Sequence, residues 1–164
     1  WHKLHLFDSR LKAWDFIFYI DINMTIHKNI NPILEIKPSR CFYANRDYSV
    51  GEKWKLEDQF DNTHKDFHTL KHAYDLSIKN YFQTGMIFYD TELIEVETKK
   101  DIMKLVQKYP FTRTNEQGIM NLYFIFEKDL FQQLPKNIQG LDTYSYWKQN
   151  DNTRITKQLV KKFK

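Results

Sequence analysis

The stretch that decides the fold is DFIFYIDINM, residues 15–24, in which an apolar run ends on Asp21 and Asn23 follows two places later. A continuous apolar run of this length is typical of a strand buried on both faces of a mainly parallel sheet. In open α/β sheets, ligands bind outside the carboxyl ends of the strands. The stretch therefore predicts a ligand site at Asp21 or, as the plainer alternative, the polar end of an ordinary strand.

Outward from this stretch, extended and helical patterns alternate along the chain. Residues 51–62 are polar and predict a loop. Because strands alternate with helices, the sequence predicts an α/β layer fold. Further strands are expected at residues 41–45 and 85–89, and helices at residues 2–12, 64–76, 98–109, 115–126 and 153–164.

The composition indicates one folded domain. Of the 164 residues, 41% are hydrophobic and 16% aromatic, which favours a full core over disorder. The formal net charge is +4, and much of the excess lies in the predicted C-terminal helix. Such a basic helix can attract phosphates or an anionic membrane surface, or it can simply be solvated. Basic and acidic residues are otherwise mixed, so no nucleic-acid partner is expected.

Cys41 is the only cysteine, so no intrachain disulfide can form, and a reducing, cytoplasmic location is favoured. It lies within an apolar pattern and is interpreted as a core residue rather than a nucleophile. No apolar run reaches 18 residues, so no transmembrane segment is expected. The chain begins with Trp1 rather than Met, which predicts a fragment or a processed product.

Two groups of residues could bind a metal ion. Asp21 and Asn23 either point the same way on a continued strand or share one tight turn, so they could converge on Mg²⁺ or Mn²⁺. One carboxylate with one carboxamide makes a weak site, which a bound diphosphate would have to complete. His64, His68 and His72 lie along one face of a predicted helix, and two of them could bind Zn²⁺. Exposed charged helices commonly carry histidines, so an incidental role is the alternative.

Three segments in this order resemble glycosyltransferases of the GT-A fold, in particular the glycogenin and lipopolysaccharide galactosyltransferase type (family 8-like). The first is WHKLHLFDSRLKAWDFIFYIDINM, residues 1–24, similar to a Lys-containing helix and a strand that ends in the family's Asp-x-Asp metal motif. NYFQTGMIFYDTELI, residues 80–94, is similar to the family's YFNSGVMLFN segment, and TNEQGIMNLYF, residues 114–124, to its DQDALN helix start. The resemblance covers roughly residues 1–135.

The resemblance implies a three-layer, mainly parallel sheet flanked by helices. It implies a single domain over residues 1–164 that corresponds to the later part of a GT-A domain and lacks the first two βα units, which bind the nucleotide base. The Lys-, Asn- and Ile-rich composition is also similar to that of glycosyltransferase-like proteins of giant DNA viruses, which implies the host cytoplasm or the virion as the location.

The resemblance also assigns roles near the first two segments. Asp21 matches the residue that faces the ribose and the metal, and Asn23 takes the place of the direct metal ligand, which is usually Asp. Gln83 and Thr84 take the place of an Asn-Ser pair that contacts the sugar or the acceptor. Gly85 follows them and would let the backbone approach a ligand closely.

Further roles fall on the third segment and on the strand at residues 41–45. Glu116 and Gln117 match the pair near the transferred sugar, so the resemblance makes them the catalytic candidates. Asn45, Arg46 and Asp47 fall where the family builds its acceptor side, and Arg46 could pair with a phosphate or a carboxylate. The alternative for each is an ordinary polar loop or helix-cap residue.

The implied reaction transfers a hexose from a UDP- or GDP-sugar to a hydroxyl of a glycan or protein acceptor, with Mn²⁺ or Mg²⁺ neutralising the leaving diphosphate. Two departures predict a weak cation site: Asn23 replaces Asp, and no His follows His72, although the family supplies a late His ligand. Lys157 or Arg154 could neutralise the diphosphate instead. A catalytically inactive GT-A-like binding domain and a basic-tailed adaptor for phosphate-rich partners remain the alternatives.

Overall fold

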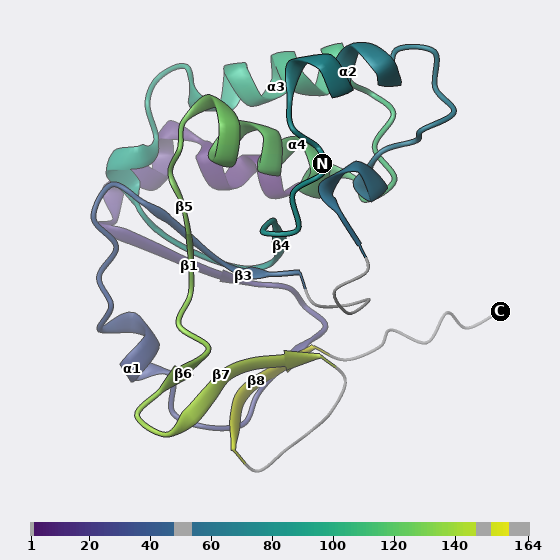
Figure 1. Ribbon diagram of the computed structural model, residues 1–164. Helices are drawn as coiled ribbons and strands as arrows, with labels where there is room; N and C mark the ends of the chain where they lie inside the picture. The colour runs from purple at the N-terminus through teal and green to yellow at the C-terminus, as the bar shows by residue number, and fades with distance from the viewer. Residues whose placement is uncertain (1, 48–53, 147–151, 158–164) are drawn as a thin grey trace, which may run out of the picture.

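The computed structural model describes residues 2–47, 54–146 and 152–157, whose strands form two sheets (Figure 1). We name them sheet A and sheet B. The strands are β1 (Phe16–Ile20), β2 (Met24–Ile26), β3 (Phe42–Arg46), β4 (Phe82–Asp90), β5 (Phe131–Gln133), β6 (Asn137–Ile138), β7 (Leu141–Tyr146) and β8 (Thr153–Lys157).

The helices are short and of several kinds. The α-helices are α1 (Asn31–Leu34), α2 (Phe67–Ala73), α3 (Thr98–Lys108) and α4 (Glu116–Asn121). Helix α4 runs directly into a π-helical turn, a feature that is often found at functional sites. That turn spans Leu122–Glu127, and the 3₁₀ helices are η1 (His2–Phe7), η2 (Ser9–Ala13), η4 (Leu56–Gln59) and η5 (Thr91–Leu93).

Sheet A has the strand order β1-β4-β3-β5, and every residue of its inner strand β4 is buried. Successive residues of a strand point to opposite faces of the sheet. Ile87 and Tyr89 accordingly pack into a core on the helical side, whereas Met86 and Phe88 pack into a second core on the other face. Burial on both faces explains why the apolar run in β4 is continuous rather than alternating.

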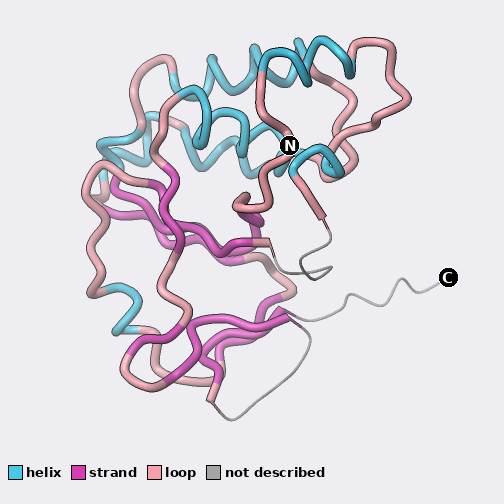
Figure 2. Tube along the Cα trace, viewed as in Figure 1, coloured by secondary structure: helices cyan, strands magenta, loops and turns pink. Residues whose placement is uncertain are grey.

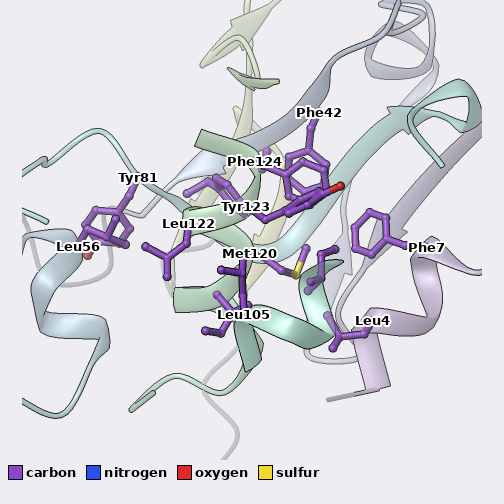
Figure 3. Close-up of a cluster of buried hydrophobic side chains, with 14 of the residues drawn as sticks. Leu4, Phe7, Phe42, Leu56, Tyr81, Leu105, Met120, Leu122, Tyr123 and Phe124 are labelled. Carbon is purple, nitrogen blue, oxygen red and sulfur yellow. The ribbon is translucent and has the colours of Figure 1, made fainter. Parts of the chain in front are cut away.

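The larger core fills the space between sheet A and the helices, and aromatic rings dominate it (Figure 3). Phe42 of β3 stacks on Phe124 of the π-helical turn with ring centroids 4.0 Å apart. Phe7 of η1 lies 5.2 Å from the same Phe124 ring. These contacts hold η1, which carries Lys3, against the π-helical turn that follows α4.

Sheet B has the order β2-β8-β7-β6 and lies on the face of sheet A away from the large helices (Figure 2). The smaller core joins the two sheets and α1, through Ile33, Met86, Phe88, Leu134 and Ile155. The molecule is thus layered as helices, sheet A, and then sheet B with α1. This confirms the predicted α/β class and its layered arrangement.

The strand directions explain where polar side chains collect. Both β1 and β3 pair antiparallel with β4, and β3 pairs parallel with β5. Strands β1, β3 and β5 therefore run in one direction and β4 runs against them, so sheet A is a mixed sheet with two antiparallel pairs and one parallel pair. The carboxyl ends of these three strands and the amino end of β4 lie along the same side of sheet A. This line of strand ends is what we call the edge of sheet A. A bulge between Ala44 and Arg46 lies at this edge.

Several predicted elements differ from the structure. The basic helix expected at 153–164 is wrong for residues 153–157, which form β8 because they pair with β2 and β7, and residues 158–164 lie outside the described part of the chain. The helix expected at 2–12 is two 3₁₀ helices, and the helix expected at 64–76 is the shorter α2. The sequence analysis also did not predict β2 or β5 to β8.

Candidate functional site

A partly buried ammonium group joins the three segments that carry the resemblance. Lys3 Nζ of η1 lies 3.0 Å from Asp21 Oδ1, just after β1, and 3.0 Å from Glu116 Oε1, at the start of α4. It also donates to Thr84 Oγ1 of β4 at 3.1 Å. We name these four residues the Lys3 cluster. Its ion pairs are largely shielded, because the three charged side chains are 10–19% exposed.

Asp21 receives further partners from both sheets. Tyr19 donates its hydroxyl to Asp21 Oδ1 at 2.8 Å, and Lys157 Nζ at the end of β8 lies 3.6 Å from Asp21 Oδ2. Burial, together with the hydrogen bond to Asp21, raises the pKa of Tyr19, so the phenol stays a donor at neutral pH. The Asp21 backbone N–H donates to the Gly85 carbonyl at 2.8 Å, which holds the carboxylate at the edge of sheet A.

Asp21 and Asn23 lie in a tight turn rather than on a continued strand. The Met24 N–H donates to the Asp21 carbonyl at 3.0 Å, which closes the turn, and Ile22 at its tip is fully exposed. At Met24 the chain enters β2 and therefore sheet B. The Asp-x-Asn sequence is thus where the chain passes from one sheet to the other.

On β4, Gln83 and Gly85 are packed closely behind this turn. The Gln83 Oε1 atom accepts from the Gly85 N–H at 2.6 Å, while Gln83 Nε2 is buried without a hydrogen-bond partner among the described residues. A Cβ added to Gly85 would lie 2.5 Å from Gln83 Oε1 and from Met24 Cε, and 3.1 Å from Lys157 Nζ. A side chain at position 85 would have to displace the ends of the Gln83, Met24 and Lys157 side chains.

Gln117 connects the Lys3 cluster to the end of β3. Its Oε1 accepts from the Thr84 N–H at 3.2 Å, and its Nε2 donates to Asp47 Oδ2 and to Gln59 Oε1, both at 2.9 Å. Tyr146 of β7 donates its hydroxyl to Asp47 Oδ1 at 3.0 Å. Burial raises the pKa of Tyr146, and so does the nearby Asp47, so the hydroxyl keeps its proton. The network therefore spans both sheets.

The start of α4 is fixed by backbone and side-chain contacts rather than by a helix cap. Asn115 has φ 52° and makes no side-chain capping hydrogen bond, so the alternative role considered for such residues, a helix cap, is not realised there. Asn121, one turn later, accepts from the Phe82 N–H and donates to the Phe82 carbonyl, both at 2.8 Å. This pair of bonds ties α4 to the first residue of β4 and so places Glu116 beside Thr84.

Hydrogen bonds and ion pairs connect most of the candidates from the sequence, namely Asp21, Asp47, Gln83, Thr84, Gly85, Glu116 and Gln117. Arg46 donates through Nε to the Lys79 carbonyl at 3.0 Å on the exposed side of β3. Asn45, its neighbour, is buried and lines a pocket between the two sheets. The difference follows from the alternation of side chains along a strand, here modified by the bulge.

Sequence reasoning missed Lys3 and Tyr146 as site residues. Lys3 was noted only as part of a Lys-containing helix, and its spacing from Asp21 carries no signal of contact. Tyr146 belongs to a strand that was not predicted. Lys157 was considered as a cation that could neutralise the diphosphate, and its Nζ lies 3.6 Å from Asp21 Oδ2.

The donor set fits a divalent cation poorly. Asp21 already contacts Lys3, Lys157 and Tyr19, and Asn23 offers no charge. Within residues 2–47, 54–146 and 152–157 no group of three or more His, Cys, Asp and Glu side chains is arranged to hold a metal. A hard cation prefers carboxylate ligands that are not already neutralised.

The histidines expected on one helix face do not act together. His68 and His72 on α2 lie with their Nε2 atoms 2.9 Å apart, whereas His64 precedes the helix and stacks on Phe111 at 4.2 Å. This separates His64 from the pair, which leaves two exposed imidazoles that share one hydrogen bond.

Sequence comparison finds similarity to galactinol synthases. The chain is similar to galactinol synthase 2 of Solanum lycopersicum, with 26% identity over 161 residues, which cover 93% of this chain and 45% of that protein. It is 24% identical over 162 residues to galactinol synthase 1 of Arabidopsis thaliana, with the same shares covered. The chain thus spans about half the length of the curated relatives it matches. No protein family model matches it.

Solved structures share the fold. Mouse xyloside xylosyltransferase 1 matches with a TM-score of 0.57 and 12% identity over 94% of this chain and 61% of that chain. The bifunctional glycosyltransferase WbbM matches with a TM-score of 0.60 and 13% identity over 95% of this chain and 30% of that chain. Together, the similarities confirm the predicted resemblance to GT-A fold glycosyltransferases of the family 8 type.

Among the helices of the described residues, none combines the length and the apolar content that crossing a membrane requires.

Proposed function

We propose that this domain transfers a hexose from a UDP- or GDP-sugar to an acceptor hydroxyl. The observation that carries the proposal is the Lys3 cluster, in which one ammonium contacts Asp21, Thr84 and Glu116 from three segments far apart in sequence. Similarity to galactinol synthases over 93% of the chain supports the same reaction class. The acceptor, a glycan or a protein, and a cytoplasmic location are parts of this proposal.

The donor would bind at the edge of sheet A where Asp21 ends β1. Asp21 would accept hydrogen bonds from the ribose, and Lys157 would face the diphosphate from the end of β8. The buried, unpartnered Nε2 of Gln83 supports a ligand here, because a buried donor without a partner costs about 1–3 kcal/mol until an acceptor arrives.

During transfer, the bond from the anomeric carbon to the diphosphate oxygen breaks, a bond to the acceptor oxygen forms, and the proton of the acceptor hydroxyl passes to the leaving diphosphate. Negative charge grows on the leaving diphosphate, and fixed cations beside it stabilise the transition state. Lys157 and Lys3 are the cations already in position. Glu116, held by Lys3, would stabilise the positive charge that develops at the anomeric carbon. Gln117 follows Glu116 and bonds Asp47, so it would fix the positions of both carboxylates relative to each other.

A binding titration tests the donor site. We expect UDP or GDP to bind the full chain in calorimetry, and Asp21→Ala to weaken binding about tenfold or more, which is the value of a charge-assisted contact. Asp75→Ala is the matched control, because Asp75 only closes an exposed turn with Ser77. Equal affinity of all three proteins, or no binding by any, rejects the donor site. Repeating the titration with Mn²⁺, with Mg²⁺ and with a chelator shows whether a cation joins the complex.

The second candidate is a GT-A-like domain that binds ligands but has no activity. Asn23 in place of Asp and the neutralised state of Asp21 favour it. Release of UDP or GDP from a panel of nucleotide sugars separates the two functions. Donor binding with release in the presence of acceptor supports the transferase, whereas binding without release supports the inactive domain.

A further inference from the structure

A pocket of about 320 Å³ lies at the end of sheet A opposite the Lys3 cluster. Phe16, the first residue of β1, pairs with Asp90, the last residue of β4, and both line this pocket. Asp21, by contrast, follows the last residue of β1. A strand of this length spans about 17 Å at the usual rise per residue. The pocket is therefore separate from the donor site.

Acidic side chains dominate the lining of this pocket, which we name the acidic pocket. Its buried part consists of Pro38, Asp90 and Thr91. Its exposed part consists of Asp15, Phe16, Ser39 and Glu92. The Thr91 N–H donates to the Asp15 carbonyl at 2.9 Å, which joins the two parts. Three carboxylates thus face one small volume, from the start of β1, the end of β4 and η5.

Asp90 is the buried carboxylate of the acidic pocket, with 6% of its surface exposed. Its Oδ2 accepts from the Arg40 backbone N–H, whereas its Oδ1 is buried with no hydrogen-bond partner among the described residues. Removing a carboxylate from water is costly unless it gains a partner, and buried charges in proteins are normally paired. Oδ1 is therefore a strong acceptor for a cationic donor that enters the pocket.

Neighbouring side chains do not neutralise the acidic pocket. Within the part of the chain that the structure describes, Asp15, Asp90 and Glu92 form no ion pair with a Lys, Arg or His. Lys37 and Arg40 flank this segment of the lining, but the contact with Asp90 comes from the Arg40 backbone. A cleft lined by charges of one sign concentrates ions of the opposite sign. The pocket therefore favours a positively charged ligand.

The arrangement suits an organic cation better than a metal ion. In residues 2–47, 54–146 and 152–157, no three His, Cys, Asp or Glu side chains are arranged to hold a metal. An ammonium or guanidinium group instead donates separate hydrogen bonds to single carboxylates. Phe16 is 38% exposed, so its ring offers an apolar surface to an aliphatic stem or to the cation itself. Sites for small molecules begin near about 300 Å³, which leaves room for one such group.

We propose that the acidic pocket binds an ammonium or guanidinium group carried on an aliphatic stem. The cation donates to Asp90, Asp15 and Glu92 attract it, and Phe16 contacts the stem. Free alkylamines carry this chemistry, and so do the Lys and Arg side chains of a partner polypeptide. The inference goes beyond the proposed function and does not depend on it.

An NMR titration of the full chain, followed through its backbone amides, tests the site. The free probes are butylammonium and butylguanidinium, and the peptide probes are the capped tripeptides Ala-Lys-Ala and Ala-Arg-Ala. Butanol and the capped tripeptide Ala-citrulline-Ala are the uncharged controls. We expect saturable shifts at residues 15–16, 39–40 and 90–92 with at least one charged probe and none with the controls. Binding of a peptide indicates a polypeptide partner, whereas binding of the free cations alone indicates a small amine.

Two variants locate the cation. Asp90→Asn keeps the size of the side chain and removes its charge, so it should weaken binding about tenfold or more. Glu92→Gln changes an exposed residue and should weaken binding about two- to threefold, as expected for a solvated charge. Glu97→Gln is the matched control, because Glu97 is 50% exposed and pairs with Lys100 on α3. If Asp90→Asn does not fold, the double variant Asp15→Asn and Glu92→Gln takes its place, with an expected loss of about fivefold.

The outcomes decide the acidic pocket independently of the donor site. Charged probes that do not bind, controls that bind equally well, or affinities that no pocket variant lowers overturn the inference. Ca²⁺ that shifts the same amides while the organic cations do not also overturns it. UDP or GDP affinity should be the same in Glu92→Gln as in the unchanged chain, because the pocket lies at the other end of β1.

Discussion

Lys3 Nζ lies 3.0 Å from Asp21 Oδ1, although the residues belong to different elements and are joined by neither a sheet nor a helix. The same nitrogen reaches Glu116, so one cation separates two carboxylates that would otherwise repel each other. The contact between η1 and the end of β1 thus organises the candidate site.

Replacing Lys3 with Met keeps the length of the side chain and removes the charge. Because two shielded carboxylates lose their partner, we expect the free energy of unfolding to fall by about 1.5–3 kcal/mol in urea titrations. Release of diphosphate should fall about a hundredfold. Lys71→Met is the control: Lys71 pairs with Glu57 but is 55% exposed, and its loss should cost less than about 1 kcal/mol. Equal effects of the two changes would contradict a special role for Lys3.

Gly85→Ala would place a methyl group 2.5 Å from Gln83 Oε1 and displace the Lys157 side chain. We expect a stability loss of about 1–3 kcal/mol from overpacking, together with weaker UDP or GDP binding in calorimetry. Gly140→Ala is the comparison, because Gly140 has φ 78° and open space around it. It should lose about 1–2 kcal/mol through backbone strain with no change in nucleotide affinity. Unchanged nucleotide affinity in Gly85→Ala would argue against a ligand at this edge.

Asn23→Asp supplies the carboxylate that the Asp-x-Asn turn lacks. Since Mn²⁺ affinity rises with the number of charged ligands, we expect it to increase roughly tenfold in calorimetry. Adding Asp21→Ala to this variant should abolish the gain. The exposed substitution Asn31→Asp controls for net charge. An affinity that does not change would mean that Asp21 and residue 23 do not converge on one ion.

High pH should destabilise the protein through its buried phenols. Burial raises the pKa of Tyr144 and Tyr146, whereas an unfolded tyrosine loses its proton near pH 10. Above that pH the unfolded chain binds fewer protons than the folded chain, so stability is full below about pH 10 and falls as the pH rises further. Urea titrations from neutral pH to pH 11 would show this slope. Tyr146→Phe should make this slope smaller. A stability that does not change above pH 10 would contradict the raised pKa of these tyrosines.

Much of the candidate site could be predicted because polar residue types and the end of an apolar run are visible within a short stretch of sequence. The apolar run before Asp21 predicted a buried strand, and β1 confirms it. The segment at residues 85–89 predicted a strand, and the structure has a longer strand there, β4. Short strands with weak periodicity, such as β5 in sheet A and β6 to β8 in sheet B, could not be predicted, since their stability comes from pairing with neighbouring strands rather than from their own residues.

The sequence by itself determined that the chain forms a layered α/β domain with Asp21, Asn23, Gln83 and Glu116 as polar candidates. Only the tertiary structure decided which residues meet. It brought Lys3 and Lys157 from distant parts of the chain to Asp21, placed Arg46 against the Lys79 carbonyl, and made residues 153–157 the strand β8 instead of a helix. The physical reason is that contacts between layers depend on strand direction, on a bulge and on core packing over long separations, none of which leaves a local pattern.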